Sequence, residues 1–446
     1  MQLMQKYKNS SFYKVFNFRD ELAKGRSCVL LFNSLNALMG CLSGGLFYTS
    51  FLMTNGINLV NISIITFIPY IANCFSVFAP SILERFPRRK WVLASLRMIN
   101  YTLTLLGITL LPRLVADAQL RIVCLVAITL IANICESIVA SGYSVWHLNF
   151  MPENVRTEYL STTQLMINIS SCGFGLLAGL VADLLAGSPH EDTIIVAFRY
   201  LAFAVAAVGM LMLVLPKEYE YPKTRERPRL RDIVVLPMKQ RKFLLTTGIC
   251  FLWTYFINIP NSVLNYYLLE NVGVSYTFIN VINVCYPLFL IIFLPFWKNQ
   301  MRTIGWWKTF AISAGLLFPT TIMYACVTAG NYLWLLPTLR LIQHYLGVGH
   351  NIAYANLPYI NLPNTDQTNY VTFQTLTSNM AVFLGMMTGT WFVAAFPDIV
   401  ITMFGMEFVN IQLLQLVTAF GQALVPGMIL VFLRHLQPDD PARIYG

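Results

Sequence analysis

The stretch from Lys217 to Lys242, KEYEYPKTRERPRLRDIVVLPMKQRK, is the longest polar segment of the 446-residue chain. It holds nine basic and four acidic residues together with Pro222, Pro228 and Pro237. Dense charge and proline predict a surface linker with one or two short helices. The sequence on both sides is strongly apolar, so this linker divides the chain near its middle.

The flanking sequence has the composition of a membrane protein. Of all residues 57% are hydrophobic and 11% charged, whereas a soluble domain is about a quarter charged. This excludes a soluble enzyme, a disordered chain and a nucleic-acid-binding protein. A bilayer core needs about 20 apolar residues per helix. The apolar runs of that length predict spans at 28–54, 58–83, 90–112, 121–147, 158–186, 193–215, 243–269, 276–297, 308–328, 331–355, 368–396 and 409–434.

These spans form two groups of six, which predicts an all-α integral membrane protein of two pseudo-symmetric six-helix bundles. The predicted organisation is an amino-terminal tail at 1–27, a first bundle at 28–216, a linker at 217–242, a second bundle at 243–434 and a carboxy-terminal tail at 435–446.

The distribution of basic residues predicts the orientation. With the amino terminus inside, 25 of the 30 Lys and Arg fall in cytoplasmic segments, as the positive-inside rule requires. We expect both termini to be cytoplasmic and the protein to lie in the plasma membrane. The charge is mainly a topology signal, and recognition of anionic lipid by the linker is the alternative.

An internal repeat relates the two halves. In the first half, Pro152 is followed by Tyr159, Gln164 and the glycine pair Gly175 and Gly179. In the second half, Pro363, Tyr370, Gln374, Gly385 and Gly389 follow in the same order, with one residue of difference in spacing. Because six spans are an even number, both copies enter the membrane in the same direction, as parallel repeats do.

The loop after the second span, Pro80 to Lys90, reads PSILERFPRRK. It is similar to the G-x-x-x-D-[RK]-x-G-[RK]-[RK] signature of the major facilitator superfamily, with Pro80 and Pro87 in the glycine places. The whole chain resembles that family in its six plus six spans and its basic central loop. The resemblance implies a cytoplasmic gate role for Glu84, Arg85, Arg88 and Arg89. A purely topogenic basic cluster is the alternative.

Two charged residues lie near mid-membrane in repeat-equivalent spans, Glu136 in the fourth and Arg340 in the tenth. An ionisable group in hydrocarbon costs about 3 kcal/mol, so both are expected to face a wet or protein-lined cavity. In the family the first, fourth, seventh and tenth spans line the central cavity. The resemblance therefore implies that Glu136 and Arg340 face each other and offset part of each other's burial cost.

Polar residues at i, i+3 and i+7 from Glu136 and Arg340 lie on the same helix faces, and similar polar faces occur in other spans. We predict a substrate site from residues of three spans: Asn133, Glu136, Asn258, Asn261, Asn265, Tyr266, Arg340, Gln343 and His344. Gly347 and His350 continue the stripe of the tenth span. The alternative for each Asn or Gln is hydrogen bonding between helices. For His344 it is a structural role. The glycine pairs, Gly40 with Gly44 in the first span, Gly175 with Gly179 and Gly385 with Gly389, are expected to be close helix contacts.

Several motifs are missing. The sequence has no phosphate-binding loop, no H-E-x-x-H, no nucleophile elbow and no metal-spaced His pair. We therefore expect no enzyme activity, catalytic residue, cofactor or metal. The nine Cys show no C-x-x-C spacing and are expected to be small buried hydrophobes.

The sequence predicts a secondary transporter that moves a small organic solute by alternating access. Solute flux in a reconstituted system would distinguish it from a receptor. Glu136 is the candidate proton-coupling group and Arg340 the ligand for an anionic part of the solute. Three questions stay open: whether transport is proton-coupled or facilitated diffusion, whether the solute is taken up or exported, and whether it is polar or amphipathic. The alternative is a membrane receptor or assembly factor with a transporter-like fold. The expected partners are a small-molecule substrate and the lipid bilayer, with no nucleic acid, and we expect a functional monomer.

Overall fold

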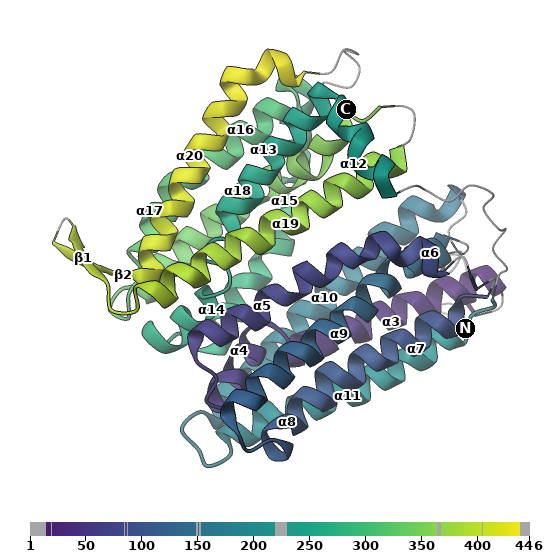
Figure 1. Ribbon diagram of the computed structural model, residues 1–446, viewed down its shortest axis with the longest axis horizontal. Coiled ribbons are helices and arrows are strands. Elements are labelled where there is room, and N and C mark those ends of the chain that lie inside the picture. Colours follow the sequence, from purple (N-terminus) through teal and green to yellow (C-terminus); the bar gives the residue numbers. More distant parts are fainter. Residues whose placement is uncertain are drawn as a thin grey trace, which may run out of the picture. The chain divides into compact units, whose positions relative to one another are not determined.

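The computed structural model describes residues 15–18, 20–83, 85–86, 88–148, 150, 153–218, 230–363, 367–403 and 405–437. These residues form two compact units. One comprises residues 1–57 and 75–227, and the other residues 58–74 and 228–446. Each unit is a bundle of helices (Figure 1).

The helices of the first unit coincide with the predicted spans. They are α3 (Glu21–Ser43), α4 (Gly45–Thr54), η1 (Cys74–Phe78), α6 (Ala79–Leu83), α7 (Lys90–Tyr101), η2 (Thr102–Gly107), α8 (Ile108–Leu114), α9 (Ala118–Leu148), α10 (Glu153–Leu185) and α11 (Glu191–Val214). The α3 helix begins within the segment assigned to the tail because the side chain of Asp20 caps it by accepting from the Ala23 amide. Arg26, counted above as a topogenic charge, is buried and donates to the carbonyls of Val15 and Phe150.

The second unit contains the helices of the predicted second bundle and one helix from the first. They are α5 (Leu59–Asn73), α12 (Leu230–Lys239), α13 (Arg241–Asn258), α14 (Leu264–Tyr266), η3 (Tyr267–Asn271), α15 (Tyr276–Ile304), α16 (Trp306–Gly315), α17 (Leu317–Ala325), α18 (Tyr332–Ile360), α19 (Gln367–Ala395) and α20 (Asn410–Leu436). The α5 helix packs on α19, and the rings of Phe67 and Phe383 meet edge to face at 5.3 Å. The α12 helix is the short helix predicted in the linker.

The two strands are an addition to the predicted all-helical fold. β1 (Val400–Met403) and β2 (Met406–Val409) pair antiparallel, and Gly405 turns the chain with φ 75°. The hairpin extends from the connection between α19 and α20 (Figure 1).

Eight helical segments among the described residues are long and apolar enough to cross a membrane. The other four predicted spans fall in the second unit, at 243–269, 308–328, 331–355 and 368–396. The first two are interrupted, at Pro260 and between α16 and α17. The last two are continuous helices, α18 and α19, that carry many polar side chains. These interruptions and polar residues position the site described next.

Candidate functional site

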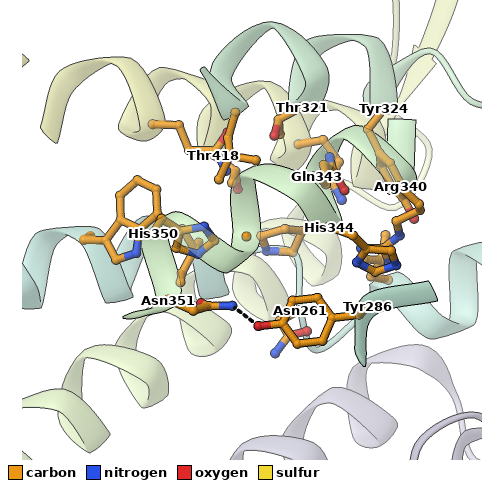
Figure 2. Close-up of a pocket in the computed structure, with 18 residues that line it drawn as sticks. Asn261, Tyr286, Thr321, Tyr324, Arg340, Gln343, His344, His350, Asn351 and Thr418 are labelled. Atoms are coloured by element: carbon orange, nitrogen blue, oxygen red, sulfur yellow. Dashed lines mark hydrogen bonds between the residues drawn. The ribbon is translucent and has the colours of Figure 1, made fainter. Parts of the chain in front are cut away.

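The second unit contains a partly open cavity of about 330 Å³ (Figure 2). Residues of α13, of the turn after it, and of α14, α15, α17, α18 and α20 line it: Trp253, Ile257, Pro260, Asn261, Leu264, Tyr286, Leu317, Thr321, Tyr324, Arg340, Gln343, His344, Gly347, His350, Asn351, Gln415, Thr418 and Gln422. No Asp or Glu belongs to this lining. The formal charge of the described wall is therefore positive and comes from Arg340.

Arg340 lies at one side of the cavity with its guanidinium over the ring of Tyr324, 5.1 Å from the ring centroid (Figure 2). The aromatic face stabilises the cation. It leaves the guanidinium edge for hydrogen bonds, because a cation–π contact uses the plane of the group and not its N–H donors. Arg340 is thus suited to a carboxylate or another planar oxyanion.

Neutral polar groups cover much of the remaining wall. The Asn351 amide donates to the Tyr286 hydroxyl at 3.0 Å, which joins α18 to α15 (Figure 2). His344 Nε2 lies 3.1 Å from the Ile282 carbonyl, and its ring packs against Tyr286 at 5.5 Å. These contacts orient Tyr286 and His344, and such fixed groups offer a solute a preorganised set of partners.

Three lining atoms are buried without a hydrogen-bond partner in the described part of the chain, the Tyr324 hydroxyl, His350 Nδ1 and Gln422 Oε1. The residues Tyr324 and Gln422 are more than nine-tenths buried, at 4% and 7% exposure. An unpaired buried polar group costs about 1–3 kcal/mol. A polar solute in the cavity would satisfy them.

The structure places four predicted site residues in this cavity, Asn261, Arg340, Gln343 and His344. The predicted stripe of the tenth span continues into the lining through Gly347 and His350. The three residues Asn258, Asn265 and Tyr266 lie outside the lining.

The seventh span explains those three exceptions. The apolar run predicts one helix over 243–269, but α13 ends at Asn258, just before Pro260, and α14 begins at Leu264. Proline has no N–H to donate to a helix, so the helical spacing that grouped the three asparagines is wrong there. Asn261 now lies in the turn, where its amide donates to the Asn258 side chain at 3.2 Å.

Sequence reasoning missed the polar face that α20 contributes. Gln415, Thr418 and Gln422 line the cavity and follow the same i, i+3, i+7 spacing used for the other spans. The rule could have found them. Tyr286 and Tyr324 give no such signal, because an isolated tyrosine in an apolar helix resembles its neighbours.

The first unit holds a separate charged cluster around Glu136. The Arg97 guanidinium of α7 lies 2.5 Å from the Glu136 carboxylate of α9. The Arg97 side chain is 9% exposed and that of Glu136 33%. The rings of Phe32 and Tyr143 flank the guanidinium at 5.1 and 5.2 Å. Within its unit Glu136 therefore pairs with Arg97, a residue to which the sequence analysis gave no role.

Hydrogen bonds between helices account for other polar residues of this unit. The Tyr101 hydroxyl donates to Asn36 Oδ1 at 2.9 Å and joins α7 to α3. The Asn133 amide donates to the Thr129 carbonyl of its own helix at 2.7 Å. Asn36 thus takes part in a hydrogen bond between two helices, and Asn133 bonds within its own helix.

The loop predicted to act in gating is described in part. Glu84 lies outside the described residues, Arg85 and Arg88 are exposed, and Arg89 is half-buried. The amides of Arg89 and Lys90 donate to the Glu218 carboxylate at 3.1 to 3.2 Å. A carboxylate at a helix amino terminus is stabilising, so Glu218 fixes the start of α7.

Comparison with known proteins identifies the fold. The family model described as Major Facilitator Superfamily matches residues 29–390, and no curated protein matches the sequence. A mutant form of the nucleoside transporter NupG is 14% identical with a TM-score of 0.67, covering 92% of this chain and 100% of its own. A bacterial homologue of the iron transporter ferroportin in an inward-facing state is 13% identical with a TM-score of 0.67, covering 92% and 98%.

A third solved structure, a POT family transporter in complex with a thioalcohol-conjugated peptide, is 14% identical with a TM-score of 0.64, covering 93% of this chain and 96% of its own. At these identities the likeness shows the fold, whereas the family model covers most of the sequence. The chain belongs to the Major Facilitator Superfamily, and it is a multi-pass membrane transporter and not an enzyme.

Proposed function

We propose that the protein is a secondary transporter that moves a small organic solute with a carboxylate or similar anionic group by alternating access. The observation that carries the proposal is the Arg340 guanidinium held over Tyr324 in a cavity whose described lining residues include no Asp or Glu. In a wall without counter-charge, an anionic solute would supply the missing partner. The amides of Gln343, Asn261 and Gln422 would bind its neutral polar groups.

The solutes named for the structural neighbours differ in whether they carry an anionic group. A peptide carries a carboxylate, and a nucleoside carries no charge. The cavity of this chain suits the first kind of solute better, because burying a cation beside a neutral ligand leaves the charge uncompensated.

The first test is transport of dipeptides, nucleosides and sugars by protein reconstituted in liposomes, after a thermal-shift screen of the same solutes. We expect stabilisation and flux with the carboxylate-bearing solutes. Arg340→Gln should reduce uptake at low solute concentration by about 10-fold or more, since a charge-assisted bidentate contact contributes about 1.5–3 kcal/mol. Arg302→Gln is the matched control, because Arg302 is an exposed arginine at the end of α15, outside the cavity.

Equal uptake by wild type and Arg340→Gln would contradict the assigned role of Arg340. Saturable binding with no flux of any solute would instead support a receptor.

We further propose that proton movement drives this transport through Glu136. A carboxylate one-third exposed and paired with Arg97 can exchange its partner for a proton without leaving a bare charge on the carboxyl. Glu136→Gln imitates the protonated carboxyl, so we expect it to remove the dependence of uptake on a pH gradient while exchange of solute across the membrane continues. The measurement is uptake into liposomes with and without an imposed gradient. A variant that still accumulates solute in response to the gradient would rule out this role.

We also propose the predicted orientation, with both termini cytoplasmic in the plasma membrane, and a functional monomer. The excess of Lys and Arg in alternate connections supports the orientation, and its test is given in the Discussion.

A further inference from the structure

A second, larger cavity of about 870 Å³ lies along α13 and α20, and it shares no residue with the cavity of Arg340. Its lining comprises Arg241, Lys242, Leu244, Leu245, Gly248, Ile249, Phe251, Leu252, Met428, Phe432, Arg434 and His435. The start of α13 and the end of α20 meet at one end of this groove, where the Lys242 ammonium donates to the Gln437 carbonyl at 3.2 Å.

The groove has two chemically distinct parts. Arg241, Lys242, Arg434 and His435 gather at the end where the two helices meet, and none of the described residues that line the groove is acidic. Every other lining residue is apolar. The apolar part opens outward, since Leu244 and Phe432 are 38% and 40% exposed.

The whole groove, from its basic end to its apolar end, has about the length of one membrane leaflet. From Arg241 to Leu252 the α13 helix rises about 17 Å at about 1.5 Å per residue, of which the apolar part from Leu244 to Leu252 takes about 12 Å. Half of the hydrocarbon core is about 15 Å. The basic end is therefore at the depth of lipid headgroups when the apolar part is at the depth of acyl chains.

We propose that this groove binds an anionic phospholipid, with the phosphate at Arg241 and Arg434 and an acyl chain along Gly248 and Phe251. The charge of the rim selects the headgroup, because phosphate accepts charge-assisted hydrogen bonds from guanidinium groups. A headgroup with net negative charge neutralises the positive charge of this rim. A zwitterionic headgroup neutralises less of it, because it brings a positive charge of its own. The occupant is a lipid because the groove joins a basic rim to an apolar channel that can hold much of an acyl chain.

Gly248 gives the groove its depth and provides a selective variant. A Cβ at Gly248 would meet no atom within 4 Å, so the backbone there accepts a side chain, and Gly248→Leu is expected to fill part of the groove. Gly427 of α20 is also exposed with open space around it, and it lies outside the groove. Gly427→Leu is therefore the matched control for a larger side chain and for higher helix propensity.

The experiment is native mass spectrometry and thermal unfolding of the purified full chain in detergent, with dioleoylphosphatidylglycerol, dioleoylphosphatidylcholine or inorganic phosphate added. We expect phosphatidylglycerol to remain bound and to raise the unfolding temperature, with little effect of the other two. Arg241→Gln combined with Arg434→Gln, and separately Gly248→Leu, should each weaken phosphatidylglycerol binding at least 10-fold. Gly427→Leu and Arg302→Gln should bind as wild type does.

Three results would overturn the proposal: equal binding of both lipids, unchanged phosphatidylglycerol binding by the two groove variants, or equal stabilisation by inorganic phosphate alone. Because bound lipid is counted directly on folded protein, a loss of stability in a variant cannot be mistaken for a loss of binding.

Discussion

Arg97 and Glu136 are joined across α7 and α9, and the two side chains differ in exposure, 9% for Arg97 and 33% for Glu136. The more buried partner is also the one that cannot lose its charge, since arginine stays protonated in proteins. Removing Glu136 therefore leaves a permanent buried cation, which the rings of Phe32 and Tyr143 stabilise in part. Removing Arg97 leaves a carboxylate that water or a proton can neutralise.

This asymmetry predicts the outcome of a double-mutant cycle. Arg97→Gln and Glu136→Gln should each lower the free energy of unfolding by about 1–3 kcal/mol. Breaking a fully buried pair costs more, about 3–5 kcal/mol. Glu136→Gln should be the more costly of the two. The double variant should lose less than the sum of the single losses, because the two sites are in contact.

Thermal unfolding in detergent measures all four proteins of the cycle. Strictly additive losses would show that the two side chains do not interact in the folded protein.

At the residue scale the sequence predicted which positions carry charge but not which charges meet. An arginine side chain reaches several ångströms from its backbone. The sequence positions of Arg97 and Glu136 therefore did not predict that the two side chains form an ion pair. Arg340, Gln343 and His344 were predictable as lining because one uninterrupted helix, α18, fixes their common face.

The α19 helix carries the second copy of the repeated glycine pair, and here the prediction of a close helix contact is confirmed. A Cβ on Gly385 or Gly389 would collide with the carbonyl oxygens of Tyr255 and Ile259. The first-span pair behaves differently. Gly40 has nothing within 4 Å of its Cβ position, and Gly44 separates α3 from α4. The expectation of a close contact is therefore wrong for Gly40.

We predict that Gly389→Ala destabilises the protein, because backbone atoms cannot move aside as a flexible side chain can. Overpacking costs about 1–3 kcal/mol, so the unfolding temperature should fall by several degrees. Gly427→Ala is the control at an open helical position and should unfold at or above the wild-type temperature. An unchanged unfolding temperature for Gly389→Ala would show that the two segments are not in contact at this point.

At the element scale the apolar runs located the ends of the twelve predicted helical segments to within about seven residues, but not the breaks inside them. Hydropathy averaged over about 20 residues does not register the change at Pro260 or the hairpin formed by β1 and β2. The hairpin depends on a backbone preference of Gly405, whose positive φ suits glycine.

At the scale of the whole molecule, the proposed orientation can be checked on a pair of threonines. Thr402 lies in β1 on the connection predicted to be external, and Thr303 lies near the end of α15 on a connection predicted to be cytoplasmic. Both are exposed. We expect a membrane-impermeant thiol reagent to label Thr402→Cys in intact cells, and Thr303→Cys only after the cells are opened.

The unsubstituted chain, which has nine free Cys, supplies the background for this labelling. The reverse pattern would place both termini outside.

The position of α5 has a consequence for how the polypeptide holds together. This helix precedes the linker by about 150 residues in sequence, yet it packs on α19 and belongs to the second unit. The backbone therefore passes between the units three times, at residues 57–58, 74–75 and 227–228. Scission within the linker removes one covalent connection and leaves α5 anchored through contacts such as Phe67 on Phe383. The two fragments of a split chain would thus share an exchanged helix, and neither would be a complete folding unit without the other.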